Sequence, residues 1–205
     1  MRFYNNLKVL NTYTPIFVIF CAEILGEINL YYQKIPIWDT MLHTVNGFVF
    51  AAVGFSLVDI FNKSDKFKFQ LSPLFLAIVA FCFSMTIGIL WEFFEFSADM
   101  ILKTDMQKDM IIDYISSTAL DPSKSNTPFI INGITSSTLT TANGEVYTIS
   151  SYLDIGLIDT MKDLFVNFIG AVVFSIIGFI YVKQRGKGKI ANQFIPVFVE
   201  RDHIE

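Results

Sequence analysis

Acidic residues and one histidine recur inside apolar segments of this chain. Within each segment they are three or four residues apart, which places the side chains on one face of a helix at about 5–6 Å. Ionisable residues inside apolar helices are costly, and they usually mark a functional site. The candidates selected by this spacing are Asp39, His43, Glu92, Glu95, Asp159, Asp163 and Asn167.

These side chains form a ligand set for a divalent cation. Carboxylate and amide oxygens suit Mg²⁺ and Mn²⁺, and a single histidine among carboxylates also permits Zn²⁺. So many carboxylates repel one another unless a cation neutralises them. A bound metal would activate water and polarise a phosphoryl or carbonyl oxygen, with a spare carboxylate as general base. The sequence therefore predicts a divalent-metal site in which Asn167 orients the ligands.

Simpler roles stay open for single members of this set. Asp39 and Asp159 lie near predicted helix starts, where capping and the helix dipole favour an acid without any function. A lone histidine such as His43 is more often a packed, hydrogen-bonded residue than a ligand. Glu92, Glu95 and Asp163, on two other helices, are harder to explain in this way, which favours a shared site.

The elements that position these residues are predicted to lie in a membrane. Hydrophobic residues make up 53% of the 205 residues and charged residues 17%, with a mean hydropathy of +0.50. Soluble domains average roughly 45–50% apolar residues and about 25% charged residues. The net charge of −4 indicates no basic surface for nucleic acid. The composition therefore excludes a disordered chain and points to a membrane protein without a nucleic-acid partner.

Four segments approach the length needed to cross a bilayer. About 20 apolar residues span a hydrocarbon core of roughly 30 Å. The segments are 14–32, 41–61, 72–98 and 161–182. We therefore predict an all-α, polytopic membrane protein with a four-helix bundle in a single membrane domain.

The basic residues predict the orientation of this bundle. Ten of the fifteen Lys and Arg residues fall in the N-terminal segment, in residues 62–71 and in the tail 183–205. Positively charged loops stay cytoplasmic, so both termini are predicted to be cytoplasmic and the acidic cluster to open to the extracytoplasmic face.

Residues 99–160 form a polar segment between the third and fourth predicted helices. Two short runs, 129–134 and 145–149, favour strands, and Asn143-Gly144 is a hairpin-turn signal between them. A small extracytoplasmic cap with a hairpin and a mobile loop are both consistent with this pattern.

Small residues predict which helices are neighbours. Gly47, Ala51 and Gly54 mark one face of the second predicted helix, and Gly170 and Gly178 mark one face of the fourth. Small residues let membrane helices approach closely, so these two helices are predicted to pack together.

Four stretches of the chain resemble a known family. They are WDTMLHTVNG from Trp38, WEFFEFSAD from Trp91, TDMQ from Thr104 and DTMKDLFVNFIG from Asp159. As an ordered set they resemble the YjdF-like family of predicted bacterial membrane proteins. The coarser pattern D-x3-H, E-x2-E and D-x3-D-x3-N-x2-G is similar to VanZ-like membrane proteins, which are associated with glycopeptide resistance. The resemblance implies a bacterial cytoplasmic membrane, and the long segment 110–158 departs from it.

Three functions fit these observations. The leading one is metal-dependent chemistry on a lipid or cell-envelope substrate that reaches the site from the membrane or the outside. The second is cation or proton transport or sensing with the same acids. The third is a non-catalytic membrane partner whose hairpin cap binds another protein. Few polar residues lie beyond Asn167 toward the cytoplasm, which disfavours a conduction path.

Overall fold

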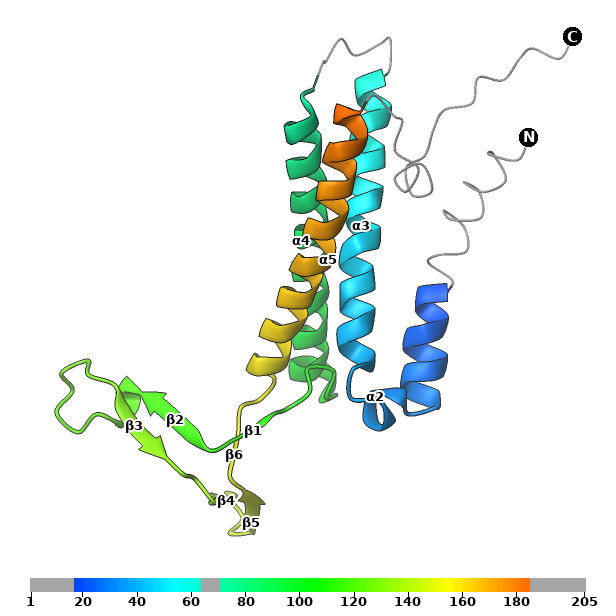
Figure 1. Cartoon of the computed structure of the whole chain (residues 1–205). Coiled ribbons are helices and arrows are strands. Elements are labelled where there is room, and N and C mark those ends of the chain that lie inside the picture. The colour runs from blue at the N-terminus through cyan, green and yellow to red at the C-terminus, as the bar shows by residue number, and fades with distance from the viewer. Residues whose placement is uncertain (1–16, 64–70, 185–205) are drawn as a thin grey trace, which may run out of the picture. The chain divides into compact units, whose positions relative to one another are not determined.

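The computed structural model describes residues 17–63 and 71–184 (Figure 1). The chain divides into two compact units, of which one comprises Met1–Phe93 with Lys162–Glu205 and the other Phe94–Met161. The second unit carries all strands found in the described residues. The predicted cytoplasmic loop 62–71 and tail 183–205 lie mostly outside the described residues.

Three long helices are the main elements of the first unit. They are α3 (Trp38–Lys63), α4 (Pro73–Leu102) and α5 (Leu157–Lys183), and α4 and α5 continue into the second unit (Figure 1). Ser72 caps α4, since its hydroxyl accepts a hydrogen bond from the backbone N–H of Phe75, and Pro73 occupies the first helical position. By length and composition each helix is a candidate membrane span, and the three correspond to the predicted spans 41–61, 72–98 and 161–182.

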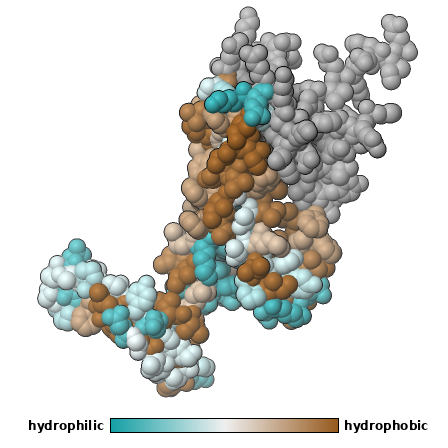
Figure 2. Space-filling model, viewed as in Figure 1, coloured by the Kyte–Doolittle hydropathy of each residue, from teal (hydrophilic) through white to brown (hydrophobic). Residues whose placement is uncertain are grey.

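The outer surface of these helices is apolar. Large side chains such as Leu74, Phe93 and Phe165 are 60–63% exposed. Figure 2 shows the apolar surface as brown patches along the helices. Exposed apolar area on this scale is typical of a surface that contacts lipid or another protein.

Of the four predicted spanning helices, three correspond to candidate spans among the described residues. The first predicted span, 14–32, begins outside the described residues and then forms a short π-helix, η1 (Phe20–Ile28), and a single turn, α2 (Tyr31–Lys34). Leu30 adopts a left-handed backbone with φ of 60°, which ends the helical run. Glu23 and Glu27 are exposed on η1. Within the described residues the first segment is therefore shorter than the other three helices, and its crossing of the bilayer stays a prediction.

Close contacts between α3 and α5 confirm that these helices are neighbours. A Cβ added to Gly47 would lie 2.2 Å from the Asn167 carbonyl oxygen, and one added to Gly170 would lie 2.1 Å from that of Thr44. The hydroxyl of Ser84 on α4 donates a 2.7 Å hydrogen bond to the Gly47 carbonyl. The three helices thus meet around Gly47, without room for a larger side chain.

An apolar cluster fills the bundle beyond this contact. It contains residues of all three helices with no exposed area, namely Ala51, Phe55, Leu76, Ala80, Ala171 and Phe174. The Phe174 ring meets those of Phe48 and Phe55 edge to face, with centroids 5.1 and 6.0 Å apart. Such packing fixes the helices that carry the polar residues.

The second unit contains three two-stranded antiparallel sheets, so the chain is not all-α. The pairs are β1 (Ile111–Ile112) with β6 (Tyr152–Leu153), β2 (Tyr114–Ser117) with β3 (Phe129–Asn132), and β4 (Ser136–Thr140) with β5 (Val146–Ser150). A short 3₁₀ helix, η2 (Thr118–Leu120), follows β2.

The predicted hairpin between 129–134 and 145–149 is wrong in its pairing. The β5 strand pairs with the Ser- and Thr-rich β4, and β3 pairs with β2. The turn is where Asn143-Gly144 predicts it, because Gly144 has φ of +89° and its N–H donates to the Thr141 carbonyl. The strands that pair with β3 and β5 are rich in Ser and Thr, so a hydropathy pattern did not predict them.

Candidate metal centre

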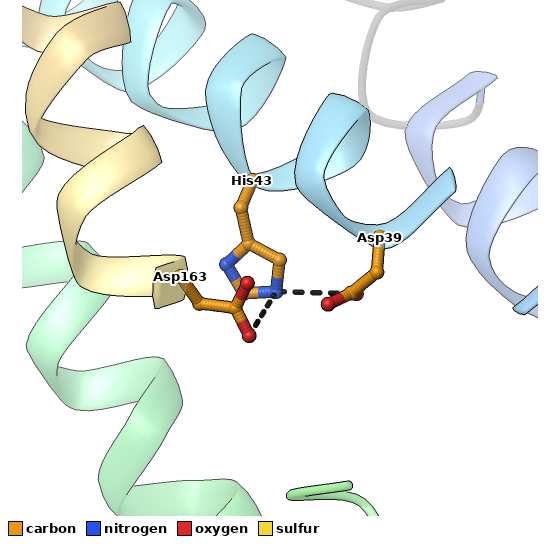
Figure 3. A group of neighbouring side chains, drawn as sticks. All are labelled: Asp39, His43 and Asp163. Atoms are coloured by element: carbon orange, nitrogen blue, oxygen red, sulfur yellow. Dashed lines mark ion pairs between the residues drawn. The ribbon is translucent and has the colours of Figure 1, made fainter. Parts of the chain in front are cut away.

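Two carboxylates and an imidazole converge inside the first unit. Asp39 and His43 lie one turn apart near the start of α3, and Asp163 faces them from α5 (Figure 3). His43 Nε2 is 3.6 Å from Asp39 Oδ1 and 3.8 Å from Asp163 Oδ2. The helical spacing of Asp39 and His43 and the close approach of α3 to α5 at Gly47 and Gly170 bring these groups together.

The spacing of these atoms matches a metal-ligand set better than a hydrogen bond. One ligand atom from each of the three residues lies within 4.8 Å of the others. Hydrogen bonds between nitrogen and oxygen are about 2.7–3.2 Å long. Two donors on a tetrahedral ion, each bonded at about 2.1 Å, are about 3.4 Å apart. Small adjustments of the side chains would therefore accommodate a cation between them.

Glu92 adds a third carboxylate to this cluster. Its Oε1 is 4.0 Å from His43 Nδ1, so both ring nitrogens face acids. Asp163 and Glu92 are buried, with 3% and 4% exposure, whereas the Asp39 side chain is 33% exposed. Three carboxylates around one imidazole leave a surplus of negative charge in a poorly solvated site. A cation, either protonated His43 or a metal ion, stabilises such an arrangement.

Asn167 lies one turn after Asp163 and is 3% exposed. Its side-chain Nδ2 is directed to α4, where it donates to the Met85 sulfur at 3.5 Å and lies against Gly88. Asn167 therefore joins α5 to α4 one helical turn further along α5 than Asp163. The sequence analysis did not identify Met85 and Gly88 as contacts of Asn167. The small residues Ser84 and Gly88, four apart on α4, were a signal for close helix packing there.

Glu95 and Asp159 are outside the three-residue group. Glu95 is buried on α4, three residues after Glu92. Asp159, in the second unit, accepts a 2.8 Å hydrogen bond from the backbone N–H of Lys108 through its Oδ2. Their role as ligands stays a prediction.

Acids of the second unit bind backbone N–H groups. Asp99 accepts hydrogen bonds from the N–H of Met106 and Gln107, at 2.7 and 2.8 Å, and from the Thr104 hydroxyl. The neighbouring chain is tied to the start of α5 by the Gln107 side-chain amide, which donates to the Thr160 hydroxyl at 2.6 Å. Asp99 therefore holds the chain that follows α4.

Asp154 performs the same function at the start of α5. It accepts hydrogen bonds from the N–H groups of Met110, Gly156 and Ile158, at 2.7, 3.2 and 2.8 Å. Desolvation alone would raise the pKa of this carboxyl, but the three N–H groups outweigh it and hold the pKa below its ordinary value. Asp154 thus caps α5 in its ionised form.

Comparisons with known proteins identify the family but no activity. A 105-residue stretch is 29% identical to an uncharacterized protein of Thermotoga maritima, covering 47% of this chain and 52% of that protein, so the chain spans about half the length of this curated relative. No solved structure matches the chain. The model of a family described as "Predicted membrane protein (DUF2238)" matches residues 2–184. The chain belongs to this family of predicted membrane proteins.

Proposed function

We propose that this integral membrane protein binds a divalent metal ion through Asp39, His43 and Asp163. The convergence of these three side chains, each offering a ligand atom within 4.8 Å of the others, carries the proposal. The ions that fit this donor set are Mg²⁺, Mn²⁺ and Zn²⁺. Glu92, Glu95, Asp159 and Asn167 belong to the wider set of proposed ligands and orienting groups.

The reaction we propose is metal-dependent chemistry on a lipid or cell-envelope substrate. When bound, the ion would polarise a phosphoryl or carbonyl oxygen of that substrate. His43 and Asp163 would hold it, and Asp39, the most exposed of the three, leaves the site open on one side. Glu92, beside the His43 Nδ1, is the carboxylate placed to accept a proton.

The packing beyond the cluster favours a site over a conduction path. The side chains of Phe55, Leu76 and Phe174 have no exposed area and fill much of the interior between Asn167 and the opposite end of the bundle. The buried polar residues described in this part are Ser56, Asp59 and Ser175. A transported cation or proton needs polar groups or water along its route. Cation or proton transport is therefore the weaker alternative, and so is a non-catalytic partner role, because it requires no such cluster.

The proposed setting is the bacterial cytoplasmic membrane, with both termini cytoplasmic and the cluster at the extracytoplasmic side. The distribution of Lys and Arg supports this orientation. A closer kinship with YjdF-like or VanZ-like proteins is the finer prediction that accompanies it.

Thermal melts of the detergent-solubilised protein test metal binding. After chelation, addition of Mg²⁺, Mn²⁺ or Zn²⁺ should raise the melting temperature for at least one ion, because a ligand that binds only the folded state stabilises it by about 2.7 kcal/mol at 100 times its Kd. His43→Ala should abolish the rise, and Glu145→Gln, at an exposed hairpin position, should retain it. A His43→Ala protein that responds to metal like the parent would contradict the proposal.

A further inference from the structure

An apolar groove runs between α4 and α5 on the first unit. Its volume is about 420 Å³. Ligand-binding cavities in proteins are typically about 300–1,000 Å³. Six of the residues that line it are Leu74, Ile78 and Phe81 from α4 and Phe168, Val172 and Phe179 from α5.

The walls of the groove offer only carbon to an occupant. Ser175 is the one hydroxyl residue among those that line it, and its oxygen is buried out of reach. Both helices are long and apolar enough to span a membrane, so the surrounding medium is hydrocarbon. The groove is open to this medium, and the chemistry that fits its apolar walls is an alkyl chain.

The α5 wall of the groove is about as long as one leaflet is thick. The lining residues on α5 run from Phe168 to Phe179, which corresponds to about 16 Å at 1.5 Å per residue. Half of a hydrocarbon core of roughly 30 Å is about 15 Å. One acyl chain lying along α5 would therefore fill the groove from the middle of the bilayer toward the end of the helix.

A cation marks the end of the groove at which a headgroup would lie. Lys183, the last residue of α5, is exposed, and its Nζ lies 5.7 Å from the centroid of the Phe179 ring. Lysines at helix ends place their stems along apolar surface and their charge at the interface. An anionic phosphate is the complementary group at this position.

We propose that the α4–α5 groove binds one acyl chain of a phospholipid, with the phosphate of that lipid paired with Lys183. This site is separate from the metal cluster, and it needs only that α4 and α5 lie in a membrane. A second copy of the chain or one of its own segments is a competing occupant. Neither is favoured by a groove that, within the described residues, ends at the Lys183 cation and offers no hydrogen-bonding atom.

Native mass spectrometry of the full chain, released from nanodiscs containing phosphatidylglycerol and phosphatidylcholine, tests the proposal. The parent should retain one phospholipid per chain, with phosphatidylglycerol preferred. Val172→Phe fills the groove and should lower retention by about tenfold or more, which is at least 1.4 kcal/mol of binding. Val173→Phe makes the same change on the exposed face beside the groove and should leave retention unchanged.

Lys183→Gln supplies a second readout that does not depend on core packing. It should remove the preference for phosphatidylglycerol while one lipid is still retained. Equal retention by the Val172→Phe and Val173→Phe proteins would overturn the proposal. A parent that retains no lipid would also overturn it, and so would a parent found as a dimer that Val172→Phe converts to a monomer. Melting temperatures of the two phenylalanine variants check that both are folded.

Discussion

The acids of the two units are in opposite environments. In the first unit, Asp39, Asp163 and Glu92 face a single imidazole at 3.6–4.0 Å, too far for direct hydrogen bonds. In the second unit, Asp99 and Asp154 accept hydrogen bonds of 2.7–3.2 Å from backbone N–H groups. The charge of the first group is complementary to an additional cation, whereas the second group binds backbone N–H groups of the chain.

Asp121, in a loop of the second unit, also accepts hydrogen bonds from nearby groups of the chain. Its carboxylate accepts hydrogen bonds from the hydroxyl and N–H groups of Ser123 and Ser125. The Ser123 hydroxyl is the leading cause, and together these donors hold the pKa of Asp121 well below its ordinary value. An acid of this type stabilises local structure without a metal. Substitutions in the first unit should therefore change the response to metal, whereas substitutions of acids in the second unit should change stability with or without metal.

The largest effect is expected from the close contact that assembles the cluster. Gly170→Ala would place a Cβ 2.1 Å from the Thr44 carbonyl oxygen, and the helix backbones must separate to relieve it. Overpacking of this kind costs about 1–3 kcal/mol and can cost more. We expect a lower melting temperature and loss of the metal response. Val45→Ala, on the exposed face of α3, is the control and should change neither.

A smaller effect is expected from the capping acid Asp154. Asp154→Ala leaves three N–H groups without their acceptor, which should cost about 1–3 kcal/mol with or without metal. Asp163→Asn should be neutral or stabilising after chelation, because it relieves repulsion, and destabilising relative to the parent when metal is present. Chemical unfolding under both conditions measures the difference, with the exposed Asp113→Ala as control. Equal losses for Asp163→Asn in both conditions would make it a structural residue.

The smallest effect is a pH dependence in the second unit. Partial desolvation raises the pKa of Asp109, and neighbouring carboxylates raise it further; these are Asp105, Asp154 and Asp99. A raised pKa means that stability falls as pH rises from the unfolded value of 3.8 through the folded pKa. Asp109→Asn should therefore stabilise the protein at neutral pH, by less than about 1 kcal/mol because exposed charges are screened. The gain should disappear near pH 4.

Asp154 makes stability depend on pH in the opposite direction to Asp109. Its lowered pKa means that its contribution to stability is present above 3.8 and is lost as pH falls through the folded pKa. The cost of Asp154→Ala should therefore persist at pH 4, where the gain from Asp109→Asn has vanished. Melting temperatures of both variants from pH 7 to pH 3 would contradict this account if the two effects vanished together.

Hydropathy was sufficient to predict the three long helices, and small residues predicted which of them touch. Gly47 and Gly170 mark the contact between α3 and α5 because only a residue without Cβ fits there. The first predicted span stays a prediction, because it begins outside the described residues and its described helix ends near the left-handed Leu30. The hydropathy pattern did not predict how the strands pair, since the strands that pair with β3 and β5 are rich in Ser and Thr.

Helical spacing predicted that acids would gather, but not which ones. Asp39 and Asp163 approach His43, while Asp159 accepts a hydrogen bond from Lys108 N–H. Both kinds of acid occur near helix starts, and spacing is the same for a ligand and for a cap. The difference depends on which backbone N–H groups the loops bring nearby, and these contacts are distant in sequence.

The most direct test of the account is pulsed electron paramagnetic resonance of Mn²⁺ added to the chelated protein. The account predicts one bound Mn²⁺ per chain, with a nitrogen coupling from a single imidazole that His43→Ala removes and that Asp113→Asn, at an exposed position outside the proposed ligand set, leaves in place. Absence of bound Mn²⁺, or a nitrogen coupling that persists in His43→Ala, would contradict a metal site at Asp39, His43 and Asp163.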